Sequence, residues 1–338
     1  MNAPTLADCH SRRDNNFHLL RLLAALAVIY GHAYPIVGAG GGDIYLQLVG
    51  NKFIGGVAVD VFFVISGLLI ASSLERGSLF RYAWARVLRI FPALVVCTAL
   101  CAFVLGPMLT TSGNYFGDVQ AWRYFVNNAS NWRTEYFLPG VFASHPDKAV
   151  NGSLWSLPVE FRLYGLFLLF GALGLMRQSR YAAVAISLML CGLAAFPRYP
   201  LLQQYQNWLE VSAFFLAGGF AWVYRDSLRL SIWGVVAVLS ACVATHGASG
   251  FSTAYSMALA YCVLYLAYVP RLPQIRGRDI SYGVYLYGWP SQQLLVHWLP
   301  GMHPLGNAAL GMLLACALGL ASWEWVERPA LKFKDRFS

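Results

Sequence analysis

Four ionisable residues lie inside or at the edge of long apolar stretches of this chain: Arg21, His32, Asp60 and Glu160. An ionisable side chain within a membrane-spanning helix is costly, so each is a candidate functional residue. Arg21 and His32 are eleven residues apart, which places them within about 20° of each other around a helix and roughly 16–17 Å apart along it. A guanidinium and an imidazole on one helix face predict a site inside a helix bundle.

Asp60 and Glu160 each stand near the start of an apolar segment, and we expect both at the depth of His32. A carboxylate can orient an imidazole and stabilise its protonated form, which suits general acid–base catalysis. We therefore predict His32, Glu160 and Asp60 as catalytic residues. Structural alternatives exist for each. Arg21 can snorkel to the membrane surface, His32 can bond a neighbouring helix, and both carboxylates suit the start of a helix.

A second basic cluster precedes the third apolar segment, where Arg86 and Arg89 stand three residues apart among aromatic residues. Residues at this spacing can face the same way on a helix. Guanidinium groups bind phosphates well, so Arg86 and Arg89, assisted by Arg21, are predicted to bind a phosphate-bearing cofactor. The alternative is the ordinary excess of basic residues on the cytoplasmic side of a membrane protein.

The stretch 281–290 is rich in tyrosine and includes Trp289 and Pro290. The proline frees a backbone carbonyl one turn earlier, which a neighbour or a cavity must satisfy. The aromatic rings can stack on a sugar, or they can be packing residues. The predicted substrate-binding residues here are Tyr282, Tyr285 and Trp289.

The composition is that of a membrane protein, with 58% hydrophobic and 12% charged residues, against about a quarter charged in a soluble domain. Ten apolar segments predict an all-α, polytopic membrane helix bundle of about ten transmembrane helices, forming one domain over 1–338. Their approximate spans are 18–36, 57–74, 90–107, 157–176, 181–196, 207–224, 230–246, 252–269, 280–298 and 306–325. We expect the aromatic-rich segment 109–156 to fold back over one membrane face.

The formal net charge is +9, but the basic residues form short clusters between apolar segments, so topology explains them better than a nucleic-acid partner does. With the amino terminus in the cytoplasm, 17 Lys and Arg residues fall in inner segments and 5 in outer ones. This predicts that both termini are cytoplasmic. The first apolar segment is long for a signal peptide and carries Arg21 and His32, so we expect it to be retained.

Seven cysteines are present, and all but Cys9 lie in apolar stretches. Their spacing is not that of metal ligands. We therefore expect neither disulfides nor a metal site.

Taken in order, these stretches resemble the acyltransferase 3 family of membrane acyltransferases, which includes O-antigen, exopolysaccharide and Nod-factor acetylases. The ordered set covers nearly the whole chain. It consists of residues 15–21 with Gly31-His32, residues 56–67, Arg86-x-x-Arg89, Ser153-Leu154-Trp155-Ser156 ahead of Glu160, residues 281–290, and Glu327-Arg328-Pro329.

By this resemblance, His32 is the catalytic histidine, and the Arg86-x-x-Arg89 pattern is associated with the acyl donor on the cytoplasmic side. The resemblance implies acetyl-CoA as co-substrate and a glycan acceptor, either lipid-linked or emerging at the membrane. It also implies the bacterial cytoplasmic (inner) membrane as the location, with membrane lipids around the protein.

The resemblance also adds Trp155 and Ser156 to the predicted substrate-binding residues. Two positions depart from the family pattern. His18 stands where an acidic residue is common, and Gly288 stands where many members carry a second histidine. These departures leave His32 as the main candidate base.

The sequence thus predicts an O-acyltransferase that moves an acyl group, most simply acetyl, from acyl-CoA to a hydroxyl of a cell-surface or exported carbohydrate. His32 either deprotonates the sugar hydroxyl or carries the acyl group itself. One alternative is a glycan or lipid transporter or flippase, which would also have intramembrane charges and broken helices; the sequence shows no inverted repeat. The other is a non-catalytic scaffold, in which Arg21, His32 and Glu160 are replaceable without effect.

Overall fold

The computed structural model describes residues 3–12, 14–50, 52–76, 78–175, 179–195, 204–248, 250–275 and 277–337. Within these ranges the chain is helical and forms no β-strand. Arg13, Arg177, Arg198 and Arg276, which the predicted orientation uses, lie outside the described residues, as do the side chains of Arg76, Arg180, Cys191 and Arg336.

Every one of the ten apolar segments lies on a helix. The helices are α2 (Phe17–Ile36), α4 (Ile54–Arg76), α5 (Leu79–Ala99), α8 (Ser156–Ala172), α9 (Ser179–Ala195), α10 (Gln206–Val223), α11 (Ile232–Ala244), α12 (Phe251–Tyr268), α13 (Ser281–Trp298) and α14 (Pro304–Ser322). Helix α5 continues through η1 (Leu100–Leu105) and α6 (Gly106–Leu109), and α14 through η6 (Trp323–Glu327), α15 (Arg328–Leu331) and η7 (Lys332–Phe337).

Within the described ranges, six helical stretches are long and apolar enough to cross a membrane. They are Phe17–Ile36, Ile54–Glu75, Leu79–Leu109, Gly152–Ala172, Phe251–Tyr268 and Pro304–Lys334. Helices α9 and α11 are shorter, and α13 carries tyrosine, serine and glutamine. The all-helical class is therefore confirmed, whereas ten crossings and the orientation of the termini stay predictions.

Helix α5 begins earlier than the sequence suggested. The Ser78 hydroxyl accepts a hydrogen bond from the Arg81 backbone N–H at 3.2 Å, which caps the helix at its start. Arg86 and Arg89 therefore lie within α5 and not ahead of it. The first half of α5 is rich in arginine and is not apolar, so the hydropathy pattern indicates only the second half as a membrane segment.

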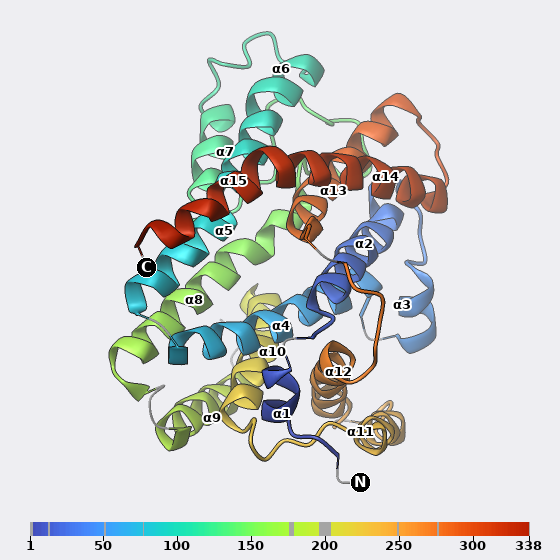
Figure 1. Ribbon diagram of the computed structural model, residues 1–338. Helices are drawn as coiled ribbons and strands as arrows, with labels where there is room; N and C mark the ends of the chain where they lie inside the picture. Colours follow the sequence, from blue (N-terminus) through green and yellow to red (C-terminus); the bar gives the residue numbers. More distant parts are fainter. Residues whose placement is uncertain are drawn as a thin grey trace. The chain divides into compact units, whose positions relative to one another are not determined.

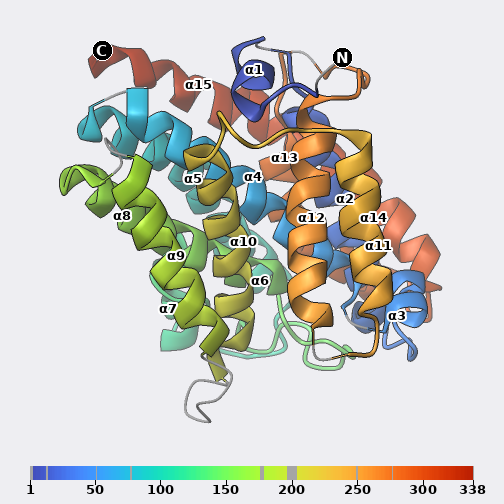
Figure 2. The same ribbon diagram turned by 90° about the horizontal axis from the view of Figure 1, so that it is seen from below.

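The chain divides into two compact units. The first unit consists of Met1–Arg21, Asp60–Tyr82 and Leu163–Ile275. In it, α9 lies beside α10 and α11 beside α12 (Figure 2). Gly218 of α10 has no room for a side chain, because a β-carbon there would overlap the Val64 carbonyl of α4. Such close backbone approach is typical of helices packed in membranes.

The second unit consists of Leu22–Val59, Ala83–Arg162 and Arg276–Ser338, and it contains most of the predicted site residues. Helices α13 and α14 pack side by side in it (Figure 1). Gly283 and Gly319 make this possible, because a β-carbon on Gly283 would stand 2.7 Å from the Gly319 Cα. The close packing fixes α13, which carries the aromatic residues predicted to bind substrate.

The segment between α6 and α8 packs onto the end of the long α5–η1–α6 helix. It contains α7 (Val119–Ala129), whose Phe125 ring lies 4.9 Å from Phe103 of η1. The Tyr115 hydroxyl donates to the Ala102 carbonyl at 2.6 Å. Burial raises the Tyr115 pKa to about 12, so this hydrogen bond persists across the physiological pH range.

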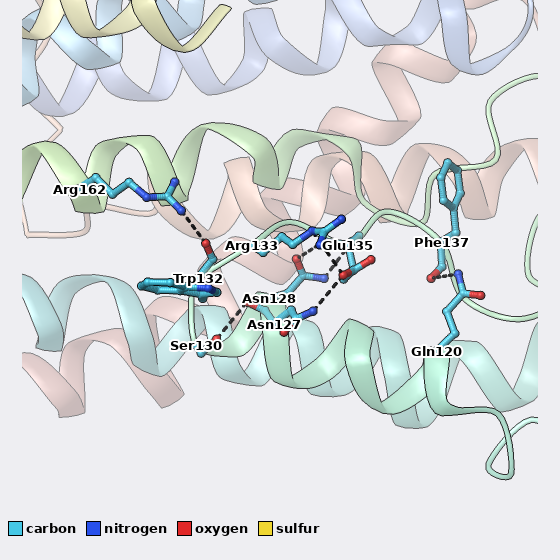
Figure 3. A network of polar contacts seen from close by, with 9 residues as sticks. All are labelled: Gln120, Asn127, Asn128, Ser130, Trp132, Arg133, Glu135, Phe137 and Arg162. Atoms are coloured by element: carbon cyan, nitrogen blue, oxygen red, sulfur yellow. Dashed lines mark hydrogen bonds and ion pairs between the residues drawn. The ribbon is translucent and has the colours of Figure 1, made fainter. Parts of the chain in front are cut away.

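The turn after α7 is held by amide and carboxylate groups (Figure 3). Asn128 donates to the Glu135 carbonyl at 2.9 Å and accepts from the Glu135 N–H at 3.0 Å. Arg162 of α8 donates to the Trp132 carbonyl at 2.8 Å. These bonds position the loop 138–151, which then reaches α13.

Candidate active site

His32 is held in one orientation by its own helix. Its Nδ1 atom lies 2.8 Å from the Val28 carbonyl oxygen, one turn earlier on α2. A carbonyl can only accept, so Nδ1 carries the proton in the neutral imidazole and Nε2 keeps the lone pair. The backbone thus selects the tautomer in which Nε2 is the base.

Two aromatic rings enclose the imidazole. The Trp289 ring of α13 packs edge-on with its centroid 4.7 Å away, and the Phe53 ring does so at 5.1 Å. Gly31 and Gly55 let the start of α4 approach α2 closely, because a β-carbon on Gly31 would stand 2.7 Å from the Gly55 nitrogen. The result is a half-buried histidine with apolar walls, an environment that strengthens polar interactions with a reactant.

Trp289 is itself fixed from the loop side. Its indole N–H donates to the Ala149 carbonyl at 2.9 Å. A β-carbon on Gly152 would stand 2.5 Å from the indole, so glycine is required beneath the ring. Ile36 and Ala149 pack against the same side chain, and Tyr136 lies at the edge of this cluster. Trp289 is therefore a rigid wall of the site.

A buried pair of amides joins α13 to α2 and α14. The Gln292 amide donates to the Ile29 carbonyl at 2.8 Å and to the Asn307 side-chain oxygen at 2.9 Å. Asn307 in turn donates to the Gln292 carbonyl at 3.1 Å. One helical turn earlier, a β-carbon on Gly288 would stand 2.7 Å from Ile29 Cγ1. This chain therefore has glycine where a larger side chain would push α2 and α13 apart.

Arg89 lies in an acidic cluster. Its guanidinium bonds the Asp279 carboxylate at 2.7 Å and stands 3.6 Å from that of Glu327. It also lies 5.7 Å from the centre of the Tyr282 ring, within range of a cation–π interaction. Asp279 is further bonded by the Ser281 hydroxyl at 2.6 Å. Two carboxylates offset the Arg89 charge, which points to a structural role alongside any role in donor binding.

The predicted residues Ser156 and Tyr285 do meet. The Ser156 hydroxyl lies 2.7 Å from the Tyr285 oxygen, and Tyr285 donates to the Ser153 carbonyl at 2.6 Å. The Tyr282 hydroxyl donates to the Ile90 carbonyl at 3.0 Å. Both phenolic protons are thus used inside the protein, whereas Trp289 alone of the predicted aromatic residues contacts the imidazole.

The hydrogen-bond partner of the His32 imidazole is the Val28 carbonyl, and the roles predicted for Glu160 and Asp60 as acid–base partners stay predictions.

Arg21 and Asp60 belong to the first unit. Arg21 lies on the same unbroken helix as His32, and Asp60 is fully buried in α4. The roles predicted for both residues stay predictions.

The sequence did not reveal several groups of this site. They are the Val28 and Ala149 carbonyls, the Gln292–Asn307 pair and Asp279. The described residues contain no group of three or more His, Cys, Asp or Glu side chains placed to hold a metal ion.

His32 thus lies between aromatic rings among apolar helices, and comparison with known proteins gives the class: the chain belongs to the acyltransferase 3 family of membrane acyltransferases, whose acyltransferase domain matches residues 14–324. It is 30% identical to an O-acetyl transferase of Shigella phage Sf6, over 94% of this chain and 96% of the relative. It is 29% identical to nodulation protein 10 of Rhizobium leguminosarum bv. viciae, over 96% and 95%.

A more distant relative is the putative membrane-bound transacylase BcsY of Komagataeibacter xylinus, 26% identical over 83% of this chain and 78% of the relative. No solved structure matches the chain. The family and its O-acetyl transferase member support an O-acyltransferase. The resemblance inferred from the ordered motifs is confirmed.

Proposed function

We propose that this enzyme transfers an acetyl group from acetyl-CoA to a hydroxyl of a cell-surface or exported carbohydrate, as a multi-pass protein of the bacterial cytoplasmic membrane. The observation that carries the proposal is the orientation of His32, whose Nε2 is left basic by the Nδ1 bond to Val28. The O-acetyl transferase named among the relatives supports the acetyl group.

In the proposed reaction, Nε2 of His32 takes the proton of the sugar hydroxyl while the sugar oxygen attacks the thioester carbonyl. The C–S bond then breaks, and the imidazolium returns the proton to the leaving CoA thiolate. A relay through an acetyl-imidazole is the variant in which Nε2 attacks the thioester first and the C–S bond breaks to release the CoA thiolate. The sugar oxygen then attacks the acetyl group, its proton goes to the thiolate, and the N–C bond to Nε2 breaks. In both, the Val28 carbonyl keeps the Nδ1 proton in place.

Donor binding is assigned to Arg86 and Arg89 on α5, and Arg21 stays a predicted contributor. Arg86 precedes Arg89 by about one turn of α5, so both reach the same face. Asp279 and Glu327 offset the Arg89 charge, and both arginines remain proposed to bind a CoA phosphate. Glu160 and Asp60 remain proposed as acid–base partners.

Replacement of His32 tests this function. His32→Ala should reduce acetyl transfer at least about a thousandfold, since it removes the base. Transfer is measured by mass spectrometry of the glycan after incubation with purified protein and acetyl-CoA. His246→Ala, at an exposed histidine after α11, is the control and should keep full activity. Undiminished transfer by a correctly inserted His32→Ala protein would exclude the role.

A further inference from the structure

A separate hollow of about 380 Å³ lies in the second unit, beyond the end of α2 and around the end of α13. Its size falls within the range of small-molecule sites. Its lining includes Val37, Ser144, His145, Val296, His297 and Met302. None of the lining residues is Arg or Lys, so it is poorly suited to the phosphates of CoA. Hydroxyl, imidazole and aliphatic groups together suit a neutral, hydroxyl-rich ligand.

His145 is the polar centre of this hollow. Its side chain is 9% exposed, and its Nδ1 atom lies 2.8 Å from the Gln293 side-chain oxygen. The Gln293 amide nitrogen donates to the Asp147 and Ala149 carbonyls at 2.8 and 2.7 Å. The Gln293 oxygen must therefore accept, so His145 Nδ1 carries the proton and Nε2 keeps its lone pair.

The Nε2 atom of His145 has no hydrogen-bond partner among the residues that the structure describes. The ring is nevertheless firmly held, because Phe142 stacks on it at 4.6 Å. Phe142 has a φ of 54°, a left-handed backbone conformation that is costly for an aromatic residue. A strained backbone beside an imidazole whose acceptor atom is available for a ligand motivates the hypothesis of a binding position. His297 lies beside it, with ring centres 5.9 Å apart.

The hollow is joined to the His32 site by one oxygen atom. The Ala149 carbonyl accepts from Gln293, which orients His145, and from Trp289, which walls His32. Val37 in the lining follows His32 by five residues and comes directly after the last residue of α2.

We propose that the hollow binds the sugar unit adjacent to the one that is acetylated, with His145 Nε2 accepting a hydrogen bond from one of its hydroxyls. The proposal rests on the proposed function, because it places the acceptor glycan at His32. His145 is a specificity residue here and takes no part in the chemistry.

The test compares two octyl glycosides built on a sugar that the wild-type protein acetylates, one a monosaccharide and one a disaccharide. His145→Phe keeps a ring against Phe142 but removes the acceptor atom. We expect a KM for the disaccharide about three- to tenfold higher, the loss of one hydrogen bond. The monosaccharide KM and the KM for acetyl-CoA should stay within about twofold. His246→Phe is the matched control.

Equal effects on both glycosides, or none on either, would overturn the subsite. Saturation-transfer NMR of the disaccharide without donor provides a readout that needs no turnover. A signal from the second sugar unit that is present with the wild-type protein and lost with His145→Phe supports the subsite. No such signal with the wild type, or an equal signal with His145→Phe, refutes it. A wild-type protein that binds the disaccharide but acetylates no glycoside would instead contradict the proposed function. If His145→Phe does not elute as a folded protein, His145→Gln takes its place.

Discussion

At the scale of single residues, the position of the candidate base depends on neighbouring glycines, which have no side chain. His32 is bonded through Nδ1 to Val28 and lies between Phe53 and Trp289. Gly55 is the position at which this arrangement is most easily disturbed. A β-carbon there would overlap the Phe53 ring and stand 3.1 Å from His32 Nδ1.

Gly55→Ala should therefore lower kcat about ten- to a hundredfold, because a small displacement of a catalytic group has a large effect on rate. Gly165→Ala is the matched control, since nothing lies within 4 Å of a β-carbon at that helical glycine. The control should retain activity and gain slight stability. Initial rates of acetyl transfer and thermal unfolding in detergent check both variants. Wild-type kcat in Gly55→Ala would show that Phe53 does not control the imidazole.

The sequence was sufficient to single out His32, because an imidazole in an apolar segment is rare and costly. It could not show what orients the ring. A carbonyl such as that of Val28 or Ala149 belongs to every residue, so only folded coordinates reveal which one is used. The same holds for Gln292 and Asn307, whose pairing depends on the register between α13 and α14.

At the scale of elements, α5 presents two arginines in different surroundings. Arg89 is bonded to Asp279 and lies near Glu327, and its side chain is 21% exposed. Arg86 lies one turn earlier on the same helix. The sequence treated the two as equivalent, since neither acidic partner is near them in the chain. The start of α5 at Leu79 could not be predicted from the sequence, because the first turns of this helix are too polar to be recognised as a membrane segment.

The two arginines should respond differently to replacement. Arg89→Gln leaves two carboxylates together without their cation and should destabilise the protein by about 3 kcal/mol or more. Adding Asp279→Asn should recover part of that loss. Arg86→Gln should raise the KM for acetyl-CoA about tenfold, through loss of a charge-assisted hydrogen bond to a CoA phosphate.

Thermal unfolding in detergent and donor kinetics separate these outcomes. An Arg89→Gln protein with wild-type stability would show that Arg89 does not stabilise the cluster formed with Asp279 and Glu327. An Arg86→Gln protein with an unchanged KM for acetyl-CoA would remove Arg86 from the donor site.

At the scale of the whole molecule, the number of crossings depends on the shorter helices. The segments from α2 to α14 are all helical, as their apolar character predicted. Length alone does not decide whether α11 (Ile232–Ala244) crosses, because thirteen residues are fewer than the about twenty that span a bilayer. Its flanking charges favour a crossing, since Arg225 and Arg229 precede it and no Lys or Arg follows before Arg271.

Reporter fusions test this crossing. Green fluorescent protein fused after Arg229 should fluoresce, as expected in the cytoplasm, and alkaline phosphatase fused after Gly247 should be active outside. Fusions at the carboxyl terminus should again report the cytoplasm. Identical readings after Arg229 and Gly247 would place α11 on one membrane face and reduce the number of crossings.

The two hydrogen bonds that the Ala149 oxygen accepts have a consequence for when the acyl donor is consumed. Both lone pairs of that atom are occupied, one by Trp289 and one by Gln293, so a shift of the loop towards either partner lengthens the bond to the other. A ligand that binds in the hollow and shifts the loop towards Gln293 therefore changes the hydrogen bond that positions the Trp289 indole. Such a linkage would couple glycan binding to the position of the groups around the base. It would thereby limit hydrolysis of the thioester when no glycan is bound.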